Sequence, residues 1–528
     1  MIVNMLIVMG GVLLSRLLGI VREASILQRF PTDTAEYNAY VAAFRVPDFL
    51  YAVIVGGALA TTLIPVFQQV WHDEGEQRAW QVANSIITLV LIILAVVLGA
   101  VALGAGSLVQ WLYPALPAEQ LRMIAGLTQL FLLSPLLLGL GGVAMALLNA
   151  REQFGLPAVA FNIYNVLIIF GAIVLAPMLG IWGIAHGLIA GAALYLLVQL
   201  PGLWRAGMRY VPRFGLRDPA VRRIGRQILP RLVGQSAVQI SFIATTSFAL
   251  LLPTLQAGPL NVAYQLMLLP HGLFAMSLVT VLFPQMAELW ARNEGAAFRE
   301  TVLRATRMIF FVTMPVAMAL AILRVPVIRL IYERNDFDPA NTALVAAPLL
   351  IYLTSVVAFA VSEPLIRGFY AMQDTRTPVL IAVGTVALNV TLGYLVVHRT
   401  NWGAPGLALA FSIANNLEAL ALLVVLLPRI GGGRGSGLAR SFTGALVCTL
   451  VMGAGLWGFV RLSRGALPMI TLAGAYGSGA DAFLLAGWLG LAGVLILALY
   501  LGAAALLRVP ELREATSLLR RRRAAKLP

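Results

Sequence analysis

Apolar runs long enough to cross a membrane recur along the whole length of this chain. A spanning helix needs about 20 consecutive, mainly apolar residues, and hydropathy with helix-ending signals predicts fourteen such spans. Hydrophobic residues make up 60% of the 528 and charged residues 11%, whereas soluble domains carry about 25% charged residues. The alternating pattern of a membrane β-barrel is absent from the sequence. The sequence therefore predicts an all-α polytopic membrane protein.

The predicted spans are bounded to within a few residues by apolar content and by glycine, proline and charged residues. Their approximate cores are residues 3–28, 37–70, 80–105, 121–149, 157–178, 182–204, 227–252, 260–290, 304–323, 342–370, 378–397, 404–427, 439–461 and 481–507.

Arginines gather in the connections on one side of this predicted bundle. The loop after the sixth span, residues 206–226, is the richest, and basic loops also follow the eighth and twelfth spans. The C-terminal tail, residues 508–528, is basic as well. Because cytoplasmic loops are enriched in Lys and Arg, both termini are predicted to be cytoplasmic. This topology accounts for the net charge of +15 through contact with lipid headgroups, and no nucleic-acid partner is predicted.

An internal repeat relates the two halves of the chain at an offset of about 220 residues. The matched stretches are SRLLG (15–19) with PRLVG (230–234), IPVFQQVW (64–71) with FPQMAELW (283–290), and NAREQFGLP (149–157) with YAMQDTRTP (370–378). Each half holds six spans, so two parallel repeats are predicted, an architecture typical of transporters. The predicted parts are an N-lobe (1–205), a basic loop (206–226), a C-lobe (227–428), a helix pair (439–507) and a basic tail (508–528).

Charged residues lie inside several predicted spans, where each is costly. In the first span Arg16 and Arg22 have one nearby acid, Glu23, so a surplus positive charge is expected to face a hydrated cavity. Guanidinium groups suit phosphate and carboxylate geometry, which favours an anionic substrate. Glu363 and Arg367 are four residues apart in the tenth span, a spacing that predicts an ion pair.

Signals for enzymatic chemistry are absent from the sequence. The chain has one lysine, Lys526, and no glycine-rich phosphate-binding loop of the GxxxxGK[ST] type. Its four histidines are widely separated, which predicts no metal site. A secondary transporter that uses an ion gradient or the membrane potential is predicted, without a cofactor. Glu363, Glu418 and Asp48 are unranked candidates for binding a coupling cation, whose identity the sequence does not give.

SRLLGIVREA in the first span, NAYVAAFRVP in the second and GFYAMQDTRTP after the tenth resemble the MurJ/MviN family of lipid II flippases. The resemblance runs from about Ser15 through the twelfth span. It implies two lobes around a cationic cavity and a C-terminal helix pair that holds the lipid tail. It also implies membership of the multidrug/oligosaccharidyl-lipid/polysaccharide exporter superfamily, a role in cell-wall synthesis and a location in the bacterial cytoplasmic membrane. The implied partners are lipid II, an undecaprenyl-diphosphate-linked glycopeptide, and membrane lipids; a monomer is expected.

Two sets of candidate residues follow from the charge pattern and this resemblance. The first set would bind the substrate, with Ser15, Arg16 and Arg22 near the diphosphate. The members of this set are Ser15, Arg16, Arg22, Glu23, Asn38, Arg45, Asp48 and Gln265. The second set would bend helices between states, and its members are Gly19, Pro47, Pro157, Pro270 and Pro378.

Some positions depart from the family pattern. Asn38 stands where the family usually has aspartate, and Tyr51 and Ala52 stand where it has arginine. Gln265 and Leu268 replace an arginine and a glutamate. A less basic cavity is therefore expected, which leaves open a flippase for another polyprenyl-diphosphate-linked glycan or a homologue that has lost transport. A drug/cation antiporter, which needs an acidic cavity, and a membrane scaffold are the remaining alternatives.

Overall fold

The structure is a computed structural model that describes residues 2–54, 58–432, 437–474, 476–477 and 479–513. Side chains are described for these residues except 2–9, 12–13, 54, 58–61, 227–235 and 273. The part of the predicted basic tail after residue 513 therefore lies outside the described residues. The same is true of Arg434 in the basic loop after the twelfth predicted span, and of the side chain of Arg231 in the repeated stretch PRLVG. The described residues form helices and connecting turns, with no β-strand among them, which confirms the predicted all-α class.

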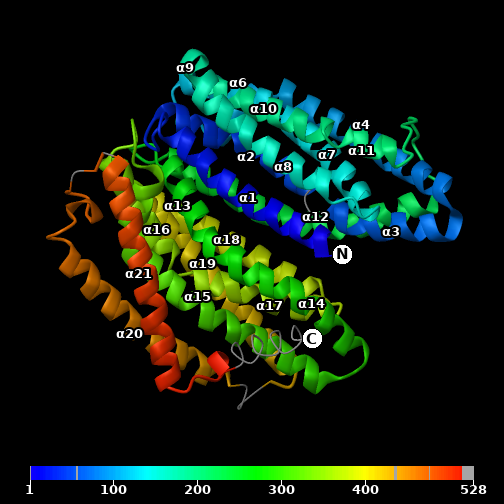
Figure 1. Cartoon of the computed structure of the whole chain (residues 1–528). Helices are drawn as coiled ribbons and strands as arrows, with labels where there is room; N and C mark the ends of the chain where they lie inside the picture. Colours follow the sequence, from blue (N-terminus) through cyan, green and yellow to red (C-terminus); the bar gives the residue numbers. More distant parts are fainter. Residues whose placement is uncertain (1, 55–57, 433–436, 475, 478, 514–528) are drawn as a thin grey trace. The chain divides into compact units, whose positions relative to one another are not determined.

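Contacts divide the chain into two compact units, Met1–Gly258 and Pro259–Pro528. The helices up to that boundary (Figure 1) are α1 (Ile2–Leu27), α2 (Ala35–Ile54), α3 (Ala58–Glu74), α4 (Glu76–Leu103), α5 (Ala105–Leu112), α6 (Ala118–Phe131), α7 (Leu133–Ala150), α8 (Gly155–Phe170), the π-helix η1 (Gly171–Leu175), α9 (Ala176–Leu179), α10 (Ile181–Leu197), α11 (Leu200–Arg205) and α12 (Pro219–Leu250).

Helix α13 (Ala257–Pro270) begins at the boundary and leads into the second unit. The remaining helices are the π-helix η2 (His271–Ala275), α14 (Met276–Ala291), α15 (Gly295–Tyr332), α16 (Pro339–Tyr352), α17 (Val356–Ala371), α18 (Arg376–Arg399), α19 (Gly403–Arg429), α20 (Leu438–Ser463), the 3-10 helix η3 (Pro468–Ile470) and α21 (Gly479–Leu506).

The sequence repeat and the contacts in the structure assign helix α12 to different halves of the chain. The repeat makes it the first helix of the second half, whereas it packs against α2 and α3 within the first unit. Its start is fixed locally, because Asp218 accepts a hydrogen bond from the backbone N–H of Ala220 and Pro219 occupies the first helical position. The division between the units therefore falls at residue 258, after α12 rather than before it.

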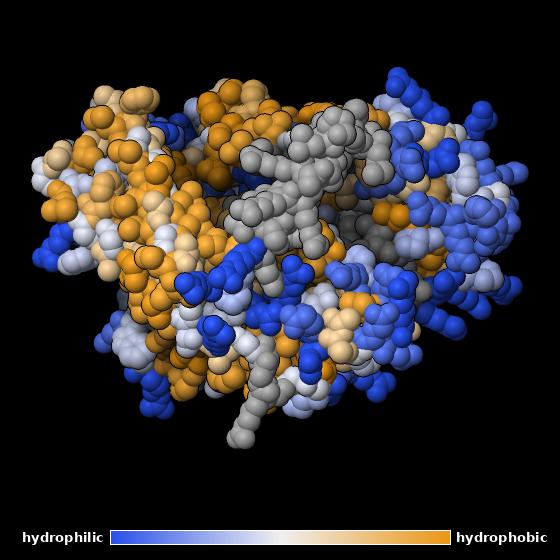
Figure 2. Space-filling model, turned by 60° about the horizontal axis from the view of Figure 1, so that its bottom comes forward, coloured by the Kyte–Doolittle hydropathy of each residue, from blue (hydrophilic) through white to orange (hydrophobic). Residues whose placement is uncertain are grey.

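Many of the helices carry apolar side chains on their outer surface. Among the described residues, nine helices are long and apolar enough to cross a membrane, and the bent pair α16–α17 could form a tenth crossing. The other four predicted spans coincide with α1, α2–α3, α12 and α13–α14. Leu103, Val281 and Phe483 are 93%, 73% and 80% exposed, and Figure 2 shows broad apolar areas beside separate hydrophilic ones. Such surfaces suit a lipid environment.

Each unit has its own packed interior. In the first, side chains of α3, α4 and α7 such as Phe67, Leu94 and Leu147 form a buried cluster. In the second, one cluster joins α14, α15, α17 and α19, and another joins α15 with α20 and α21. The predicted C-terminal pair, α20 and α21 (orange and red in Figure 1), thus packs against α15 through residues such as Met452 and Trp488.

Candidate functional site

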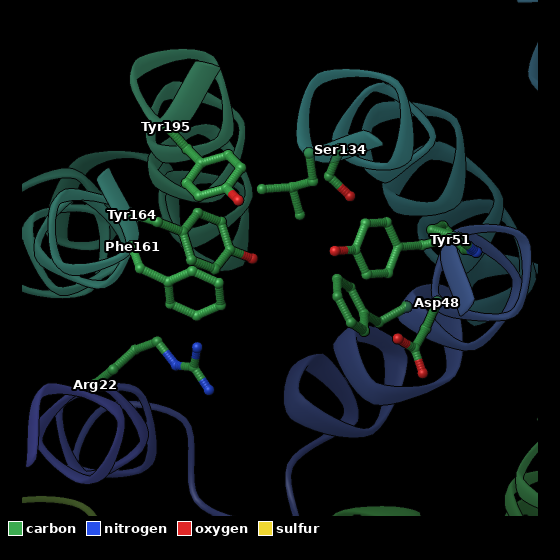
Figure 3. A pocket seen from close by; sticks show the side chains of 10 residues that line it. Arg22, Asp48, Tyr51, Ser134, Phe161, Tyr164 and Tyr195 are labelled. Atoms are coloured by element: carbon green, nitrogen blue, oxygen red, sulfur yellow. The ribbon is translucent and has the colours of Figure 1, made fainter. Parts of the chain in front are cut away.

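A cavity of about 260 Å³ lies within the first unit. We call it the first-unit cavity. It is bounded by side chains from α1, α2, α7, α8 and α10, as Figure 3 shows. Its lining residues are Arg22, Phe44, Pro47, Asp48, Tyr51, Ser134, Leu138, Phe161, Tyr164 and Tyr195. The hydroxyl groups of Tyr51 and Tyr164 point toward each other across it (Figure 3). The cavity is thus lined by aromatic rings and hydroxyls, with one cation and one carboxylate.

A stripe of glycines on α10 forms the basis of one wall. Gly183, Gly187 and Gly191 are spaced by four residues and so share a helix face. A Cβ atom at Gly187 would lie 2.7 Å from the Cα of Gly171, and one at Gly191 would lie 2.8 Å from the carbonyl oxygen of Tyr164. Only glycine allows α8 and α10 to approach so closely. This approach sets Tyr164 of α8 and Tyr195 of α10 on the same side of the cavity.

The opposite wall is built around Pro47 in the middle of α2. Proline lacks an N–H and frees the carbonyl four residues earlier, which here belongs to Ala43. The hydroxyl of Thr128 on α6 donates to that carbonyl at 3.3 Å, and the hydroxyl of Tyr113 donates to the carbonyl of Ala42 at 3.2 Å. Side chains from neighbouring segments therefore satisfy the interrupted helix, as membrane helices require. Asp48 follows the proline directly and lines the cavity.

Arg22 is the cation of the first-unit cavity. Its Nη1 donates to Oδ1 of Asn165 on α8 at 3.1 Å, and Nδ2 of Asn165 donates to Oγ of Ser15 at 3.4 Å. A guanidinium group carries five N–H donors, and this is its one hydrogen bond to a described residue. The arrangement therefore leaves Arg22 with donors for a ligand while Asn165 orients it.

Glu23 and Asn38 serve the packing around the start of α2. Glu23 is 5% exposed and accepts a hydrogen bond from the hydroxyl of Tyr37. Asn38 donates to the carbonyls of Thr32 and Thr34, both at 2.8 Å, and accepts from the N–H of Gly258 at 2.9 Å. Neither residue lines the first-unit cavity.

Two charged side chains of α2, Arg45 and Asp48, contact α12. Nε of Arg45 donates to the hydroxyl of Thr246 at 2.7 Å, and its guanidinium lies 5.6 Å from the ring centre of Phe242. Nε2 of Gln239 donates to Oδ2 of Asp48 at 3.0 Å. These contacts explain why α12 packs in the first unit. They also bring Asp48 to the cavity while Arg45 is absent from its lining.

The other candidate residues lie apart from this cavity. Arg16 is exposed on α1, and a Cβ at Gly19 would meet only open space. Pro157 and Pro378 are buried near the starts of α8 and α18. Gln265 lies on α13 within the second unit, five residues before Pro270. The helix changes to π geometry directly after Pro270, at η2.

The predicted ion pair between Glu363 and Arg367 is wrong. Glu363 lies 3.6 Å from Nε2 of His271, which belongs to η2. The guanidinium of Arg367 lies over the rings of Phe283 and Tyr370 instead, at 5.6 and 5.9 Å. A spacing of four residues permits an ion pair, but cation–π contacts compete with it for the guanidinium.

Sequence reasoning missed most of the aromatic and amide groups of the cavity. Tyr164, Asn165 and Tyr195 all lie in spans that read as apolar. Polar residues within these apolar spans could have indicated the cavity, because polar side chains inside membrane helices usually face a protein interior or a cavity. Asn162 and Asn165 both interrupt the fifth predicted span in this way.

Comparison with known proteins shows which family this chain matches. The family described as lipid II flippase MurJ matches residues 32–475. The lipid II flippase MurJ of Burkholderia cenocepacia is 29% identical over 436 residues, covering 80% of this chain and 83% of that protein. A probable lipid II flippase MurJ of Vibrio cholerae is 28% identical, covering 79% of this chain and 81% of its own length.

Solved structures give the same fold. A lipid II flippase MurJ in an inward closed conformation aligns with a TM-score of 0.76 at 20% identity, over 96% of this chain and 99% of that one. An inward-facing multidrug transporter of the MATE family and the MOP superfamily aligns with a TM-score of 0.67 at 14% identity, over 79% of this chain and 94% of that one. The match across most of the sequence, together with this fold, shows that the chain belongs to the MurJ family of lipid II flippases.

Proposed function

We propose that this protein moves lipid II from the inner to the outer leaflet of the bacterial cytoplasmic membrane. The substrate assignment is supported by the family and by relatives named as lipid II flippases. The role of the site is supported by one observation, that Arg22 lines the first-unit cavity and uses one of its five donors on a described residue. The protein is then a flippase and not an enzyme, and both termini face the cytoplasm.

In this proposal the guanidinium of Arg22 binds the diphosphate of the lipid carrier. Charge-assisted hydrogen bonds from guanidinium to phosphate are strong and directional. Asn165 and Ser15 hold Arg22 in position, while the rings and hydroxyls of Tyr51, Tyr164 and Tyr195 offer contacts for the sugar-bearing headgroup. The polyprenyl tail stays in lipid along the apolar helices α20 and α21. Alternation of two lobes of one monomer then exposes the headgroup to either side.

The bends of helices give this alternation a structural basis. Pro47 interrupts α2 at the cavity wall, and Pro270 precedes the π-helix η2. Both positions have lost regular helical hydrogen bonds, so their geometry can change at low cost. Pro157 and Pro378, near the starts of α8 and α18, and Gly19 of α1 complete this proposed set of bending positions.

A second substrate class has one observation in its favour. The first-unit cavity carries one cation, Arg22, beside one carboxylate, Asp48, and Tyr51 stands where the resemblance leads us to expect arginine. A cavity of balanced charge suits a headgroup with fewer anionic groups than lipid II, whose peptide adds carboxylates to the diphosphate. A flippase for another polyprenyl-diphosphate-linked glycan is therefore the alternative.

A flipping assay in proteoliposomes separates these proposals. Purified protein is reconstituted with labelled lipid II or with a peptide-free polyprenyl-diphosphate glycan, and movement to the opposite leaflet is followed. We expect lipid II to move with the wild type and with Arg122→Ala, an exposed control on α6, and to stop with Arg22→Ala. Movement of the peptide-free glycan alone would favour the alternative, and movement of neither lipid would contradict both.

A further inference from the structure

The first-unit cavity is lined by one carboxylate as well as by one cation. Asp48 of α2 and Arg22 of α1 lie on opposite sides of it, as Figure 3 shows. Among the described residues that line the cavity, no other side chain carries a charge at neutral pH. The cavity therefore has a positive side and a negative side, and the function proposed above uses the positive side alone.

Arg22 and Asp48 do not neutralise each other. Arg22 donates to Asn165 and Asp48 accepts from Gln239, and no ion pair within the described part of the chain joins the guanidinium to the carboxylate. The phenol group of Tyr164 interacts electrostatically with both charges, so both act on the same part of the cavity. Each charge is therefore left for water or a ligand to neutralise.

Asp48 uses a small part of its hydrogen-bonding capacity within the protein. Its Oδ2 accepts a hydrogen bond of 3.0 Å from Nε2 of Gln239 on α12, a residue that is 8% exposed. This is its one hydrogen bond to a described residue, although an ionised carboxylate has about four acceptor sites. A carboxylate in a membrane helix usually has a charged partner. The buried amide of Gln239 thus orients Asp48, and Oδ1 remains available to a ligand.

A primary ammonium group has the chemistry that the negative side of the cavity can bind. It is compact and carries three N–H donors, and Oδ1 of Asp48 is a charged acceptor for one of them. Phe44 and Tyr51 lie four residues before and three residues after Asp48 on α2, so the three share a helix face. Aromatic ring faces also attract cations. Asp48 is the only His, Cys, Asp or Glu among the described lining residues, so a metal ion would lack protein ligands.

We propose that Asp48 binds an ammonium group on the headgroup of the transported lipid and thereby selects headgroups that carry one. The role of Asp48 rests on the function proposed above and deepens it, because Arg22 would bind the diphosphate of the same headgroup. The two charges of the cavity then match a headgroup that carries charges of both signs.

Lipid II offers such a headgroup when its peptide contains a diamino acid. The diphosphate and the peptide are attached to the same sugar, so a flexible peptide can bring its ammonium group to one side of a cavity whose other side holds the diphosphate. A polyprenyl-diphosphate glycan without a peptide or an amino group has nothing to neutralise Asp48. Binding it would leave a desolvated carboxylate without a partner, which is costly. Asp48 would therefore disfavour that lipid.

Three forms of one lipid test the role of Asp48. Lipid II with a lysine-containing peptide is used with its side-chain amine free, dimethylated or acetylated. Dimethylation keeps the positive charge and acetylation removes it, while the diphosphate is the same in all three. Binding to the full-length protein is measured by native mass spectrometry at matched concentrations. We expect wild type to bind the acetylated form about tenfold or more weakly than the free amine, as for loss of a charged hydrogen bond, and to prefer the dimethylated form over the acetylated one.

Variants of Asp48 show whether this residue causes the preference. Asp48→Asn should lose it and stay folded, because the asparagine carbonyl oxygen can still accept from Gln239. Asp48→Glu keeps the charge and should keep a preference. Glu119→Gln, at an exposed acid on α6, is the control and should behave as wild type. Unfolding in detergent checks that each variant is folded.

The outcomes separate the role of Asp48 from the proposed function. Equal binding of the three forms by wild type would overturn the role of Asp48 and leave the proposed function standing. A preference that survives in Asp48→Asn would also overturn it, since another group would then recognise the amine. Failure of wild type to bind any of the three forms would contradict the proposed function and the role of Asp48 with it.

Discussion

The two units each place an arginine inside their helices, and the two side chains are used in opposite ways. Arg22 of the first unit makes one hydrogen bond to a described residue and faces a cavity. Arg329 of the second unit is fully buried and uses its whole guanidinium. It binds both carboxylate oxygens of Glu333, and its Nη atoms donate to the carbonyls of Met469, Thr471 and Gly474.

The comparison shows how an arginine that only stabilises the fold differs from one that is available to a ligand. Arg329 fastens the connection between α20 and α21 onto α15, with Tyr476 also against its guanidinium at 5.4 Å. Every donor group has a partner within the protein, so nothing remains for a ligand. Arg22 has the converse arrangement, with one partner that orients it and further donors that face open space. The number of donors already used, rather than burial or charge, distinguishes the two.

Replacing Arg329 should have the largest effect on stability. Arg329→Met leaves Glu333 buried without its charged partner and the carbonyls of Met469 and Gly474 without donors, a loss of about 3–5 kcal/mol in the free energy of unfolding. Unfolding in detergent measures it. Arg334→Met, an exposed neighbour on the same connection, is the control and should change little. Equal stability of the two variants would mean that the buried network contributes nothing.

Adding one carbon atom at Gly191 should damage the cavity wall of the first unit. Gly191→Ala places a Cβ 2.8 Å from the carbonyl oxygen of Tyr164, so α8 and α10 must separate. Overpacking of this kind costs about 1–3 kcal/mol in the free energy of unfolding. Gly99→Ala on α4, where a Cβ meets nothing within 4 Å, serves as the control. If both variants unfold alike, close packing does not hold this wall.

Replacing Arg22 should affect stability far less than replacing Arg329. Arg22→Met removes one hydrogen bond, to Asn165, which corresponds to about 0.5–1.5 kcal/mol in the free energy of unfolding. The same detergent unfolding assay gives a direct comparison of the two arginines. A loss for Arg22→Met as large as that for Arg329→Met would remove the distinction between them.

The smallest effect on the free energy of unfolding is expected for replacement of Asp374, which lies between α17 and α18, outside the membrane-spanning helices. Partial burial acts to raise the pKa of Asp374, but hydrogen bonds from Thr377 and Arg429 outweigh it and hold that pKa at about 2. Since the pKa is depressed on folding, the contribution to stability is present above about pH 4 and is lost as pH falls toward 2.

We expect Asp374→Asn to lower the free energy of unfolding by only about 0.5–1 kcal/mol at pH 7, because the side chain of Arg429 is 45% exposed and solvent screens its charge. The difference from wild type should shrink in acid. Unfolding followed between pH 7 and pH 3 measures this convergence, and a constant difference across that range would contradict the assigned cause.

Much of the fold was predictable because the membrane imposes it. Long apolar runs can satisfy their backbone only as helices or closed barrels, and runs such as that of α4 leave no alternative to a helix. The grouping of α12 was not predictable from the repeat, since it depends on contacts that Gln239 and Thr246 make with Asp48 and Arg45 of α2. Those contacts join residues about 200 positions apart, and no local pattern marks them.

Of the residues that line the cavity, mainly the charged ones could be predicted from the sequence. Arg22 was identified because a charge in a membrane helix is costly and needs a reason. The family resemblance also selected Asn38, whose amide is occupied by backbone groups. The sequence did not predict that Glu363 faces His271, because a single histidine forms no spacing pattern with a residue on another helix. Composition and spacing identify the unusual residues, and three-dimensional contacts decide which of them remain available.

The most direct test of the account is native mass spectrometry of the purified protein with lipid II. Wild type, Arg22→Ala and the exposed control Arg122→Ala are compared at matched concentrations. The account predicts that wild type and Arg122→Ala bind lipid II, and that Arg22→Ala weakens binding about tenfold or more, as expected when a charge-assisted contact to phosphate is lost. Equal binding by folded Arg22→Ala would contradict the claim that this arginine is held ready for the diphosphate.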